Sequence, residues 1–229
     1  YGEHGAIVHY SADEKSNVPL KEGKLFMTDT GGHYLEGSTD ITRTVALGEV
    51  GNIEKEHFTL VARAMLRLAN TVFLYGCSGA NLDCIAREVF WKEGLNFNHG
   101  TGHGVGYLLN IHEGPINFRW KEGERPAPAL EENMVITDEP GIYIEGSHGI
   151  RLENELLVRK TVKNEYGQFM NFEILTYVPI DLDAILPEKM STEEKEMLNH
   201  YHKQVYEKVS PYLSEEERIW LKEYTRAVK

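Results

Sequence analysis

Residues 99–106 read HGTGHGVG, with a glycine at every second position from Gly100 to Gly106. Because each glycine in a helix interior costs about 1 kcal/mol relative to alanine, four glycines in eight residues disfavour a helix and predict an extended or irregular segment. Four steps of roughly 3.3 Å then separate His99 from His103 by about 13 Å along an extended chain. The two imidazoles therefore cannot share one metal ion, and we expect at most one of them to be a ligand.

Outward from this segment, the sequence predicts short strands and amphipathic helices. Apolar residues that recur every three or four positions from 53 to 74 predict a helix with one buried face. Two capping-box patterns, which begin at Ser191 and Ser214, predict two terminal helices that form an appendage to the core. The other expected elements are a helix at 82–93 and strands at 6–10, 25–29, 39–47, 134–138, 142–144 and 151–158.

Composition limits the classes of function. The chain has 229 residues, of which 41% are hydrophobic, so it is long and apolar enough to bury a core. Its net charge of -12 disfavours nucleic acid and anionic membranes as partners. Cys77 and Cys84 are expected to be free thiols. No signal peptide or transmembrane run is visible, so we expect a cytoplasmic protein.

Two pairs of acidic residues lie where hairpins would bring them face to face. If the strands that carry Asp29 and Asp40 pair through the intervening turn, these residues fall opposite or nearly opposite each other, with Cβ atoms roughly 5 Å apart. Glu139 and Glu153 are equidistant from Gly146, so a turn there faces them as well. Facing carboxylates destabilise a sheet unless a cation lies between them. The alternative is that all four are ordinary surface acids among the 36 acidic residues.

Four carboxylates carry four negative charges, which two divalent cations would offset. A pair of ions about 3.5 Å apart, bridged by carboxylates and a water, generates hydroxide at neutral pH. Oxygen ligands with a single imidazole favour manganese, with cobalt, zinc or iron as alternatives. The sequence therefore predicts a site for two divalent metal ions.

These residues and their local motifs resemble the pita-bread metallopeptidases, a family that includes methionine aminopeptidase, prolidase and aminopeptidase P. An aspartate is followed eleven residues later by a second one, then by a histidine in HGTGHGVG, a glutamate in TDEPGIY and a glutamate in GIRLENE. These motifs, with GAIVHY, TDITRT and NIHEGP, look closest to the aminopeptidase P members, and the resemblance covers essentially the whole chain. It implies an α+β pita-bread fold, in which helices flank a curved, mostly antiparallel sheet.

The resemblance implies five metal ligands. Asp29 would hold one ion, and His103 and Glu139 would complete the site of the other. Asp40 and Glu153 would bridge both ions. His103 is then the ligand among the two histidines of the glycine-rich segment.

The same resemblance places four residues on the substrate side: His9, His99, His112 and Tyr143. Ordinary core or strand positions are the alternative for His9, His112 and Tyr143. Arg151, two residues before Glu153, points to the same face of a strand and would orient that carboxylate or contact substrate. The remaining histidines match no site motif and are expected at the surface: His4, His33, His57, His148, His200 and His202.

The implied activity is hydrolysis of the peptide bond between an N-terminal residue and a following proline, which releases the first amino acid. A hydroxide that bridges the two ions would attack the first carbonyl, and Glu139 would carry the proton to the leaving nitrogen. Neutral His99 or His112 would donate a hydrogen bond to the oxyanion, and His9, His112 and Tyr143 would wall a pocket for the proline ring. The alternatives are a prolidase-type dipeptidase and a metal-free peptide-binding or scaffold relative of the same fold.

The resemblance also divides the chain into a pita-bread catalytic domain at 1–170 and a C-terminal extension with two helices at 171–229. Such an extension is found in the long, multidomain form of aminopeptidase P. Catalytic domains of this family start upstream of the GAIVHY motif, so we expect an N-terminally truncated fragment of a longer protein. The expected partners are peptides with proline in second position and a second copy of the full-length protein in a homodimer.

Overall fold

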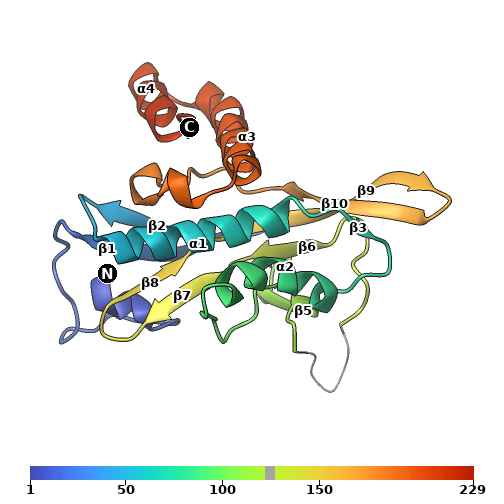
Figure 1. Ribbon diagram of the computed structural model, residues 1–229, viewed down its shortest axis with the longest axis horizontal. Coiled ribbons are helices and arrows are strands. Elements are labelled where there is room, and N and C mark those ends of the chain that lie inside the picture. The colour runs from blue at the N-terminus through green and yellow to red at the C-terminus, as the bar shows by residue number, and fades with distance from the viewer. Residues whose placement is uncertain (122–126) are drawn as a thin grey trace.

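The computed structural model describes residues 1–121 and 127–229, which form the strands and helices drawn in Figure 1. The strands are β1 (Lys24–Tyr34), β2 (Gly37–Leu47), β3 (Phe73–Leu74), β4 (Gly102–Val105), β5 (His112–Phe118), β6 (Val135–Asp138), β7 (Gly141–Ile144), β8 (His148–Arg151), β9 (Asn154–Asn164) and β10 (Gly167–Ile174). The α-helices are α1 (Asn52–Ala69), α2 (Gly79–Trp91), α3 (Thr192–Val209) and α4 (Glu215–Tyr224). Short 3-10 helices are η1 (Gly2–Ala6), η2 (Leu182–Ala184), η3 (Pro187–Lys189) and η4 (Ser210–Tyr212).

The strands form one six-stranded sheet and two two-stranded ribbons. The order in the large sheet is β3-β10-β9-β6-β4-β5, and the ribbons are β1-β2 and β7-β8; all strand pairs recorded in the described residues are antiparallel. The ribbons join the sheet near Glu153, whose backbone N–H donates to the carbonyl of Thr42 at 3.0 Å. Helices α1 and α2 lie over the strands, and α3 and α4 gather on the other side of α1 (Figure 1). Antiparallel strands with helices segregated beside them match the expected α+β class.

Helix α1 buries the apolar face that the sequence predicts, with Phe58, Val61, Met65 and Leu68 fully buried. It ends at Ala69 rather than near residue 74, because the side chains of Asn70 and Thr71 donate to carbonyls of its last turns at 2.8 and 2.9 Å. The residues that follow leave the helix to pair with β10 as strand β3. Val72, which continues the apolar repeat, is 63% exposed.

The predicted strand at 6–10 is wrong. The chain there begins with the 3-10 helix η1, and Ile7 is exposed. The backbone of Gly5 packs so closely on β8 that a Cβ added at Gly149 would lie 1.7 Å from the Gly5 carbonyl oxygen. Close backbone contact between two glycines, rather than side-chain alternation, therefore fixes this segment.

The two hairpins set the positions of the acidic residues. In β1-β2, Asp29 pairs with Thr42 and Asp40 pairs with Gly31, so the two carboxylates are diagonal neighbours on one face rather than directly opposite. In β7-β8, Ile144 pairs with His148 on either side of a turn that contains Gly146 at φ 70°. The turn predicted at Gly146 is confirmed, and its register brings the chain ends that carry Glu139 and Glu153 together.

The C-terminal helices begin with the predicted capping boxes at Ser191 and Ser214. Helix α3 buries Leu198, Tyr201 and Val205, so it packs into the core and is not a loose appendage. The predicted boundary between residues 170 and 171 falls inside β10, which belongs to the large sheet.

Three histidines expected at the surface are buried, namely His57, His148 and His202. His57 Nδ1 and His148 Nε2 share a hydrogen bond of 2.8 Å, and His202 Nε2 accepts from the backbone N–H of Ile180 at 3.0 Å. The mutual hydrogen bond lowers the cost of burying His57 and His148, whereas Nδ1 of His202 has no hydrogen-bond partner among the described residues. In the part of the chain that the structure describes, no helix combines the length and apolar character needed to span a bilayer.

Candidate metal centre

The five residues proposed as ligands converge from five segments of the sheet and its two ribbons. They lie on β1 (Asp29), β2 (Asp40), β4 (His103), the junction after β6 (Glu139) and the junction between β8 and β9 (Glu153). Their ligand atoms form overlapping groups in which all atoms lie within 4.8 Å of one another: Asp29, Asp40 and Glu153; His103, Glu139 and Glu153; and Asp40, His103 and His112. Residues up to 124 positions apart in sequence, from Asp29 to Glu153, thus form one cluster.

His103 is held so that Nε2 faces the carboxylates. Its Nδ1 lies 2.9 Å from the carbonyl oxygen of Gly104, which accepts a hydrogen bond and therefore fixes the proton on Nδ1 of the neutral ring. Nε2 then presents its lone pair at 3.4 Å from Oε1 of Glu139 and 3.5 Å from Oδ2 of Asp40. A lone pair that faces two carboxylates is unfavourable unless a proton or a cation lies between them.

Hydroxyl groups and a guanidinium orient the carboxylates. Thr42 Oγ1 donates to Oε2 of Glu153 at 2.7 Å, and Thr137 Oγ1 donates to Oε1 of Glu139 at 3.1 Å. Arg151 Nη2 donates to Oδ2 of Asp29 at 2.8 Å. These partners fix the rotamers of the carboxylates, as the surroundings of metal ligands commonly do.

Burial and mutual repulsion disfavour ionisation of the central carboxyl groups. Burial raises the pKa of Glu153 well above its ordinary value, and the charges of Glu139 and Asp40 raise it further. Burial also raises the pKa of Glu139, although the charges of His103 and Arg151 oppose the shift. Burial alone would lower the pKa of His103, but hydrogen bonds to Asp40 and Gly104 and the nearby carboxylates raise it overall. The cluster has an excess of negative charge that bound cations would offset.

The donor set fits hard divalent cations. The five proposed ligands supply four carboxylates and one imidazole with its lone pair turned inward, and a second imidazole, that of His112, lies within 4.8 Å of the ligand atoms of Asp40 and His103. No sulfur ligand is among the groups formed by the described residues. Such oxygen-rich donor sets suit manganese and related ions, whereas structural zinc is commonly held by sulfur-rich sets.

Three residues that the sequence analysis proposes for substrate contact, His99, Tyr143 and Arg151, form a chain of hydrogen bonds that leads to the cluster. The ring of His99 lies 2.7 Å from the Gly100 carbonyl through Nδ1 and 2.9 Å from the Tyr143 hydroxyl through Nε2. The same hydroxyl accepts from Arg151 Nη1 at 3.0 Å, so its own proton is directed to Nε2 of His99. Burial, with the charges of Arg151 and Arg87, lowers the pKa of His99 to about 4, so this ring is neutral at neutral pH.

His9 and His112 lie in different surroundings. His9 lines a pocket with Ile7, Val8, Asp29 and Arg151, among others. The ring of His112 packs edge-on against His103 with centroids 4.3 Å apart. Burial and the charge of His103 lower the pKa of His112. Tyr143 bonds to His99 and Arg151, and neither Tyr143 nor His112 is among the residues that line the pocket of His9.

A second pocket touches the cluster from the side of the β1-β2 hairpin. It is lined by Asp29, Thr30, Gly31, Gly32, His33, Thr39, Asp40 and Ile111. It shares Asp29 with the pocket that contains His9, so the two hollows meet at the cluster.

Sequence reasoning did not identify the residues that support the ligands. Thr42 and Thr137 each lie two residues from a ligand, and strand alternation could have placed them on the ligand face. Glu155 accepts the backbone N–H of Asp40 at 2.8 Å, and burial raises its pKa to about 7. Asp138 is fully buried, and neither of its carboxyl oxygens has a hydrogen-bond partner among the described residues.

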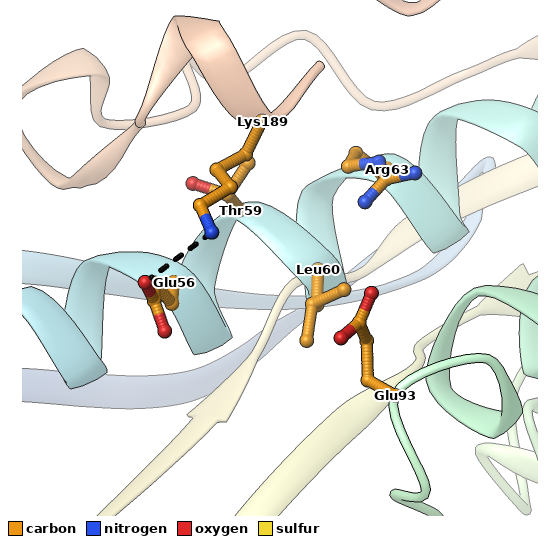
Figure 2. Close-up of a pocket in the computed structure, with 6 residues that line it drawn as sticks. All are labelled: Glu56, Thr59, Leu60, Arg63, Glu93 and Lys189. Carbon is orange, nitrogen blue, oxygen red and sulfur yellow. Dashed lines mark ion pairs between the residues drawn. The ribbon is translucent and has the colours of Figure 1, made fainter. Parts of the chain in front are cut away.

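A further pocket lies on the outer side of α1 and shares no lining residue with the cluster. Figure 2 shows its walls: Glu56, Thr59, Leu60, Arg63, Glu93 and Lys189. Lys189 of η3 reaches Glu56 of α1 at 3.5 Å, so this pocket marks the junction between α1 and the C-terminal segment.

An antiparallel sheet with flanking helices that carries this five-residue cluster defines the pita-bread class of metallopeptidase domain. Comparison with family models gives the particular family. The model of metallopeptidase family M24 matches residues 1–160, and the model of the C-terminal region of peptidase M24 matches residues 168–228. The chain belongs to metallopeptidase family M24.

Similar proteins agree with this assignment. The chain is 39% identical over 232 residues to the Probable Xaa-Pro aminopeptidase P of Paracoccidioides brasiliensis (strain Pb03), and the match covers 99% of this chain and 38% of that protein. The crystal structure of X-prolyl aminopeptidase from Caenorhabditis elegans, described as a cytosolic enzyme with a di-nuclear active site, superposes with a TM-score of 0.92 at 36% identity, covering 99% of this chain and 37% of that one. The structure of the Xaa-Pro dipeptidase from Bacillus anthracis superposes with a TM-score of 0.63 at 34% identity, covering 79% of this chain and 46% of that one.

The predicted pita-bread fold and the resemblance to aminopeptidase P are confirmed by these similarities. The chain spans less than two fifths of the length of the first two relatives.

Proposed function

We propose that the protein is a metal-dependent aminopeptidase that removes the first residue from peptides whose second residue is proline. The observation that carries this proposal is the convergence of four carboxylates and one imidazole in overlapping groups. The substrate class is supported by the names of the relatives, Xaa-Pro aminopeptidase P and X-prolyl aminopeptidase.

The cluster would hold two divalent ions, for which we propose manganese, with cobalt, zinc or iron as alternatives. Asp29 would ligate one ion, and His103 and Glu139 the other. Asp40 and Glu153 would bridge both. The bridging role of Glu153 is supported by its membership of two groups, one with Asp29 and one with His103. Two such ions supply a water of lowered pKa and polarise the scissile carbonyl.

Glu139 would move the proton. Its carboxylate is 17% exposed and lies beside the cluster, where Thr137 binds one oxygen, Oε1, at 3.1 Å. Burial raises the pKa of Glu139, which brings its proton affinity closer to that of a working acid and base at neutral pH. It would take a proton at a carboxylate oxygen and return it to the leaving nitrogen of proline.

A histidine would bind the developing oxyanion. His99 has both ring nitrogens occupied, by Gly100 and by Tyr143, so in this structure it positions Tyr143 and Arg151. His112 packs against the ligand His103 and is exposed, and a neutral ring there can donate one N–H toward a bound carbonyl. We therefore assign the oxyanion contact to His112 and a positioning role to His99.

The pocket lined by Ile7, Val8 and His9 would bind a substrate side chain next to Asp29 and Arg151. Proline as the second residue presents a nitrogen without N–H, so recognition must rest on the shape of its ring. Contacts from His9 and from Tyr143, close to Arg151, would serve this purpose.

Two alternatives remain distinct in their observable behaviour. A prolidase-type dipeptidase would cleave only Xaa-Pro dipeptides; the aminopeptidase names of the relatives that match 99% of this chain support the aminopeptidase. A metal-free peptide-binding relative would bind without cleavage, and the presence of all five ligand residues argues against it.

The wider organisation is also part of the proposal. We propose a catalytic part near 1–170 and a C-terminal extension near 171–229, with the sheet itself continuing to Ile174. We further propose a cytoplasmic protein that acts on peptides and forms a homodimer at full length. The description of the C. elegans relative as cytosolic supports the location.

The direct test is an assay of peptides that differ in length and in the second residue, with and without added manganese. We expect manganese-dependent release of the first residue from Xaa-Pro-Xaa tripeptides and little release from matched Xaa-Ala-Xaa tripeptides. Cleavage restricted to Xaa-Pro dipeptides would instead indicate a prolidase. Binding of these peptides with no cleavage under any metal would indicate the scaffold alternative.

A further inference from the structure

Arg43 is a buried cation on β2, three residues after Asp40. It is 6% exposed, and alternation along the strand points its side chain away from the face of Thr42 that serves the metal cluster. A guanidinium stays charged in proteins and carries five N–H donors, so its burial requires acceptors all around it.

On one side, these acceptors belong to the backbone that carries Glu153. Nη1 of Arg43 donates to the carbonyl oxygens of Glu153 and Thr42 at 2.5 and 2.9 Å. Nη2 donates to Oδ1 of Asn154, the next residue, at 2.7 Å. Glu153 is thus fixed from two directions, because Thr42 Oγ1 binds its carboxylate and Arg43 binds its carbonyl.

On the other side, the acceptors come from the C-terminal segment beyond β10. Nη2 donates to the carbonyl of Val178 at 2.9 Å and to the hydroxyl of Tyr201 at 2.8 Å, and Nε donates to the carbonyl of Pro179 at 3.2 Å. Tyr201 lies on α3 and is 1% exposed. Its hydroxyl donates a hydrogen bond to the carbonyl oxygen of Val178 at 2.7 Å. The C-terminal segment therefore supplies about half of the acceptors that hold Arg43.

Helix α3 is anchored independently of Arg43. The carboxylate of Glu194, which is 1% exposed, accepts hydrogen bonds from Nε of Arg63 at 3.0 Å and from Nε of Arg67 at 2.6 Å. Both arginines lie on α1. The ion pair between Lys189 of η3 and Glu56 also joins the segment before α3 to α1 (Figure 2). Tyr201 is consequently presented to Arg43 from a fixed helix, so its position can be transmitted through the guanidinium to the backbone of Glu153.

We propose that Arg43 and Tyr201 are positioning residues through which the C-terminal segment sets the place of Glu153 in the metal centre. The proposal rests on the metal-binding function proposed above. Glu153 belongs both to the group with Asp29 and to the group with His103 and Glu139. Its displacement therefore weakens the binding of both ions together, whereas loss of a ligand to one ion affects mainly that ion. The C-terminal segment is then part of the support of the metal centre.

The test is a titration of the metal-free protein with Co²⁺, followed by calorimetry and by visible absorption, with unfolding temperature measured in parallel. The variants are Arg43→Lys, which cannot span the same acceptors, and Tyr201→Phe, which removes one oxygen. The matched controls are Arg63→Lys, which weakens the other anchor of α3, and Tyr206→Phe, the same change on the same helix.

We expect the wild type to bind two Co²⁺ ions. Arg43→Lys should raise the Kd for both by about 10- to 100-fold and alter the absorption bands, as the loss of a partner behind a ligand commonly does. Tyr201→Phe should act in the same direction by about fivefold, the effect of one hydrogen bond. Arg63→Lys should lower the unfolding temperature. Both controls should leave affinity and spectrum unchanged, because Arg67 still holds Glu194 and keeps α3 in place.

Each other outcome overturns a defined part of the account. Wild-type affinity and spectrum in both variants would show that Arg43 and Tyr201 serve folding alone. If Arg43→Lys changes metal binding and Tyr201→Phe does not, the C-terminal segment does not set the position of Glu153. If Arg43→Lys does not fold, the milder Tyr201→Phe decides. Failure of the wild type to bind Co²⁺ would refute the metal centre itself and this inference with it.

Discussion

The Nε2 atom of His103 lies 3.4 Å from Oε1 of Glu139, and the other ring nitrogen is committed to the carbonyl of Gly104. A ring lone pair and a carboxylate oxygen thus converge on one point from β4 and from the junction after β6. Both would be stabilised by a cation at that point. We propose two roles for Glu139, as a metal ligand and as a proton carrier.

Glu139→Gln should keep the shape of the side chain and remove its ability to take a proton. We expect turnover of an Xaa-Pro-Xaa peptide to fall by about 10²- to 10⁴-fold at saturating metal, which is the usual contribution of a general acid-base group. Glu145→Gln, at the exposed turn of the nearby β7-β8 hairpin, is the control and should retain activity. Near-normal turnover in Glu139→Gln with metal bound would remove Glu139 from proton transfer.

Metal binding should stabilise the folded state, because the ligands come from strands that converge only in the fold. At a concentration of Mn²⁺ about 100 times the Kd, each site should add about 2.7 kcal/mol to the free energy of unfolding. Asp40→Asn should abolish most of this gain, and chelation should reverse it. A thermal unfolding series with and without Mn²⁺ measures the effect; equal gains in wild type and Asp40→Asn would place the bound metal elsewhere.

Helix α1 offers a matched pair of valines that tests the fold. Val61 is fully buried, whereas Val72 is 63% exposed beyond the end of the helix. Val61→Ala should lower the free energy of unfolding by about 2 to 3 kcal/mol, and Val72→Ala should change it by less than about 0.5 kcal/mol. Chemical denaturation checks both values, and equal losses would contradict the observed end of α1.

Acid should destabilise the protein partly through His202. Burial, with the charges of Arg43 and Arg226, lowers the pKa of His202 from 6.5 to about 4. Between these two values the unfolded chain binds more protons than the folded one, so this contribution is present above pH 6.5 and is lost as pH falls toward 4. The loss between pH 7 and pH 5 is on the order of 2 kcal/mol.

The variant His202→Gln keeps an acceptor for the N–H of Ile180 and removes the titration. Its free energy of unfolding should therefore fall less between pH 7 and pH 5 than that of the wild type. His200→Gln, at an exposed position of the same helix, is the control and should follow the wild type. Parallel pH profiles for all three proteins would show that His202 does not titrate as described.

The sequence predicts the convergence of the five proposed ligands, because each of them lies in a local motif with restricted backbone geometry. Alternating glycines in HGTGHGVG exclude a helix, and β4 does form at Gly102–Val105. The symmetric spacing of Glu139 and Glu153 about Gly146 gives the correct turn. The hairpin of Asp29 and Asp40 closes with Tyr34 paired to Gly37, which leaves the two aspartates nearly opposite each other, offset by two positions.

The support of the cluster is less accessible from sequence. Arg43 and Tyr201 lie 158 residues apart, and nothing local to either indicates that they bond. The strand predicted at 6–10 failed for a related reason, since the contact between Gly5 and Gly149 is made by backbone atoms and leaves no side-chain pattern. Long-range polar and backbone contacts must be seen in three dimensions.

The central claim is that the cluster binds two divalent ions, and anomalous diffraction from crystals grown with Mn²⁺ tests it most directly. We predict two anomalous peaks, one bounded by Asp29, Asp40 and Glu153 and the other by His103, Glu139 and Glu153. Absence of peaks at the cluster in Mn²⁺-saturated crystals, or a strong peak elsewhere with the cluster empty, would contradict the account.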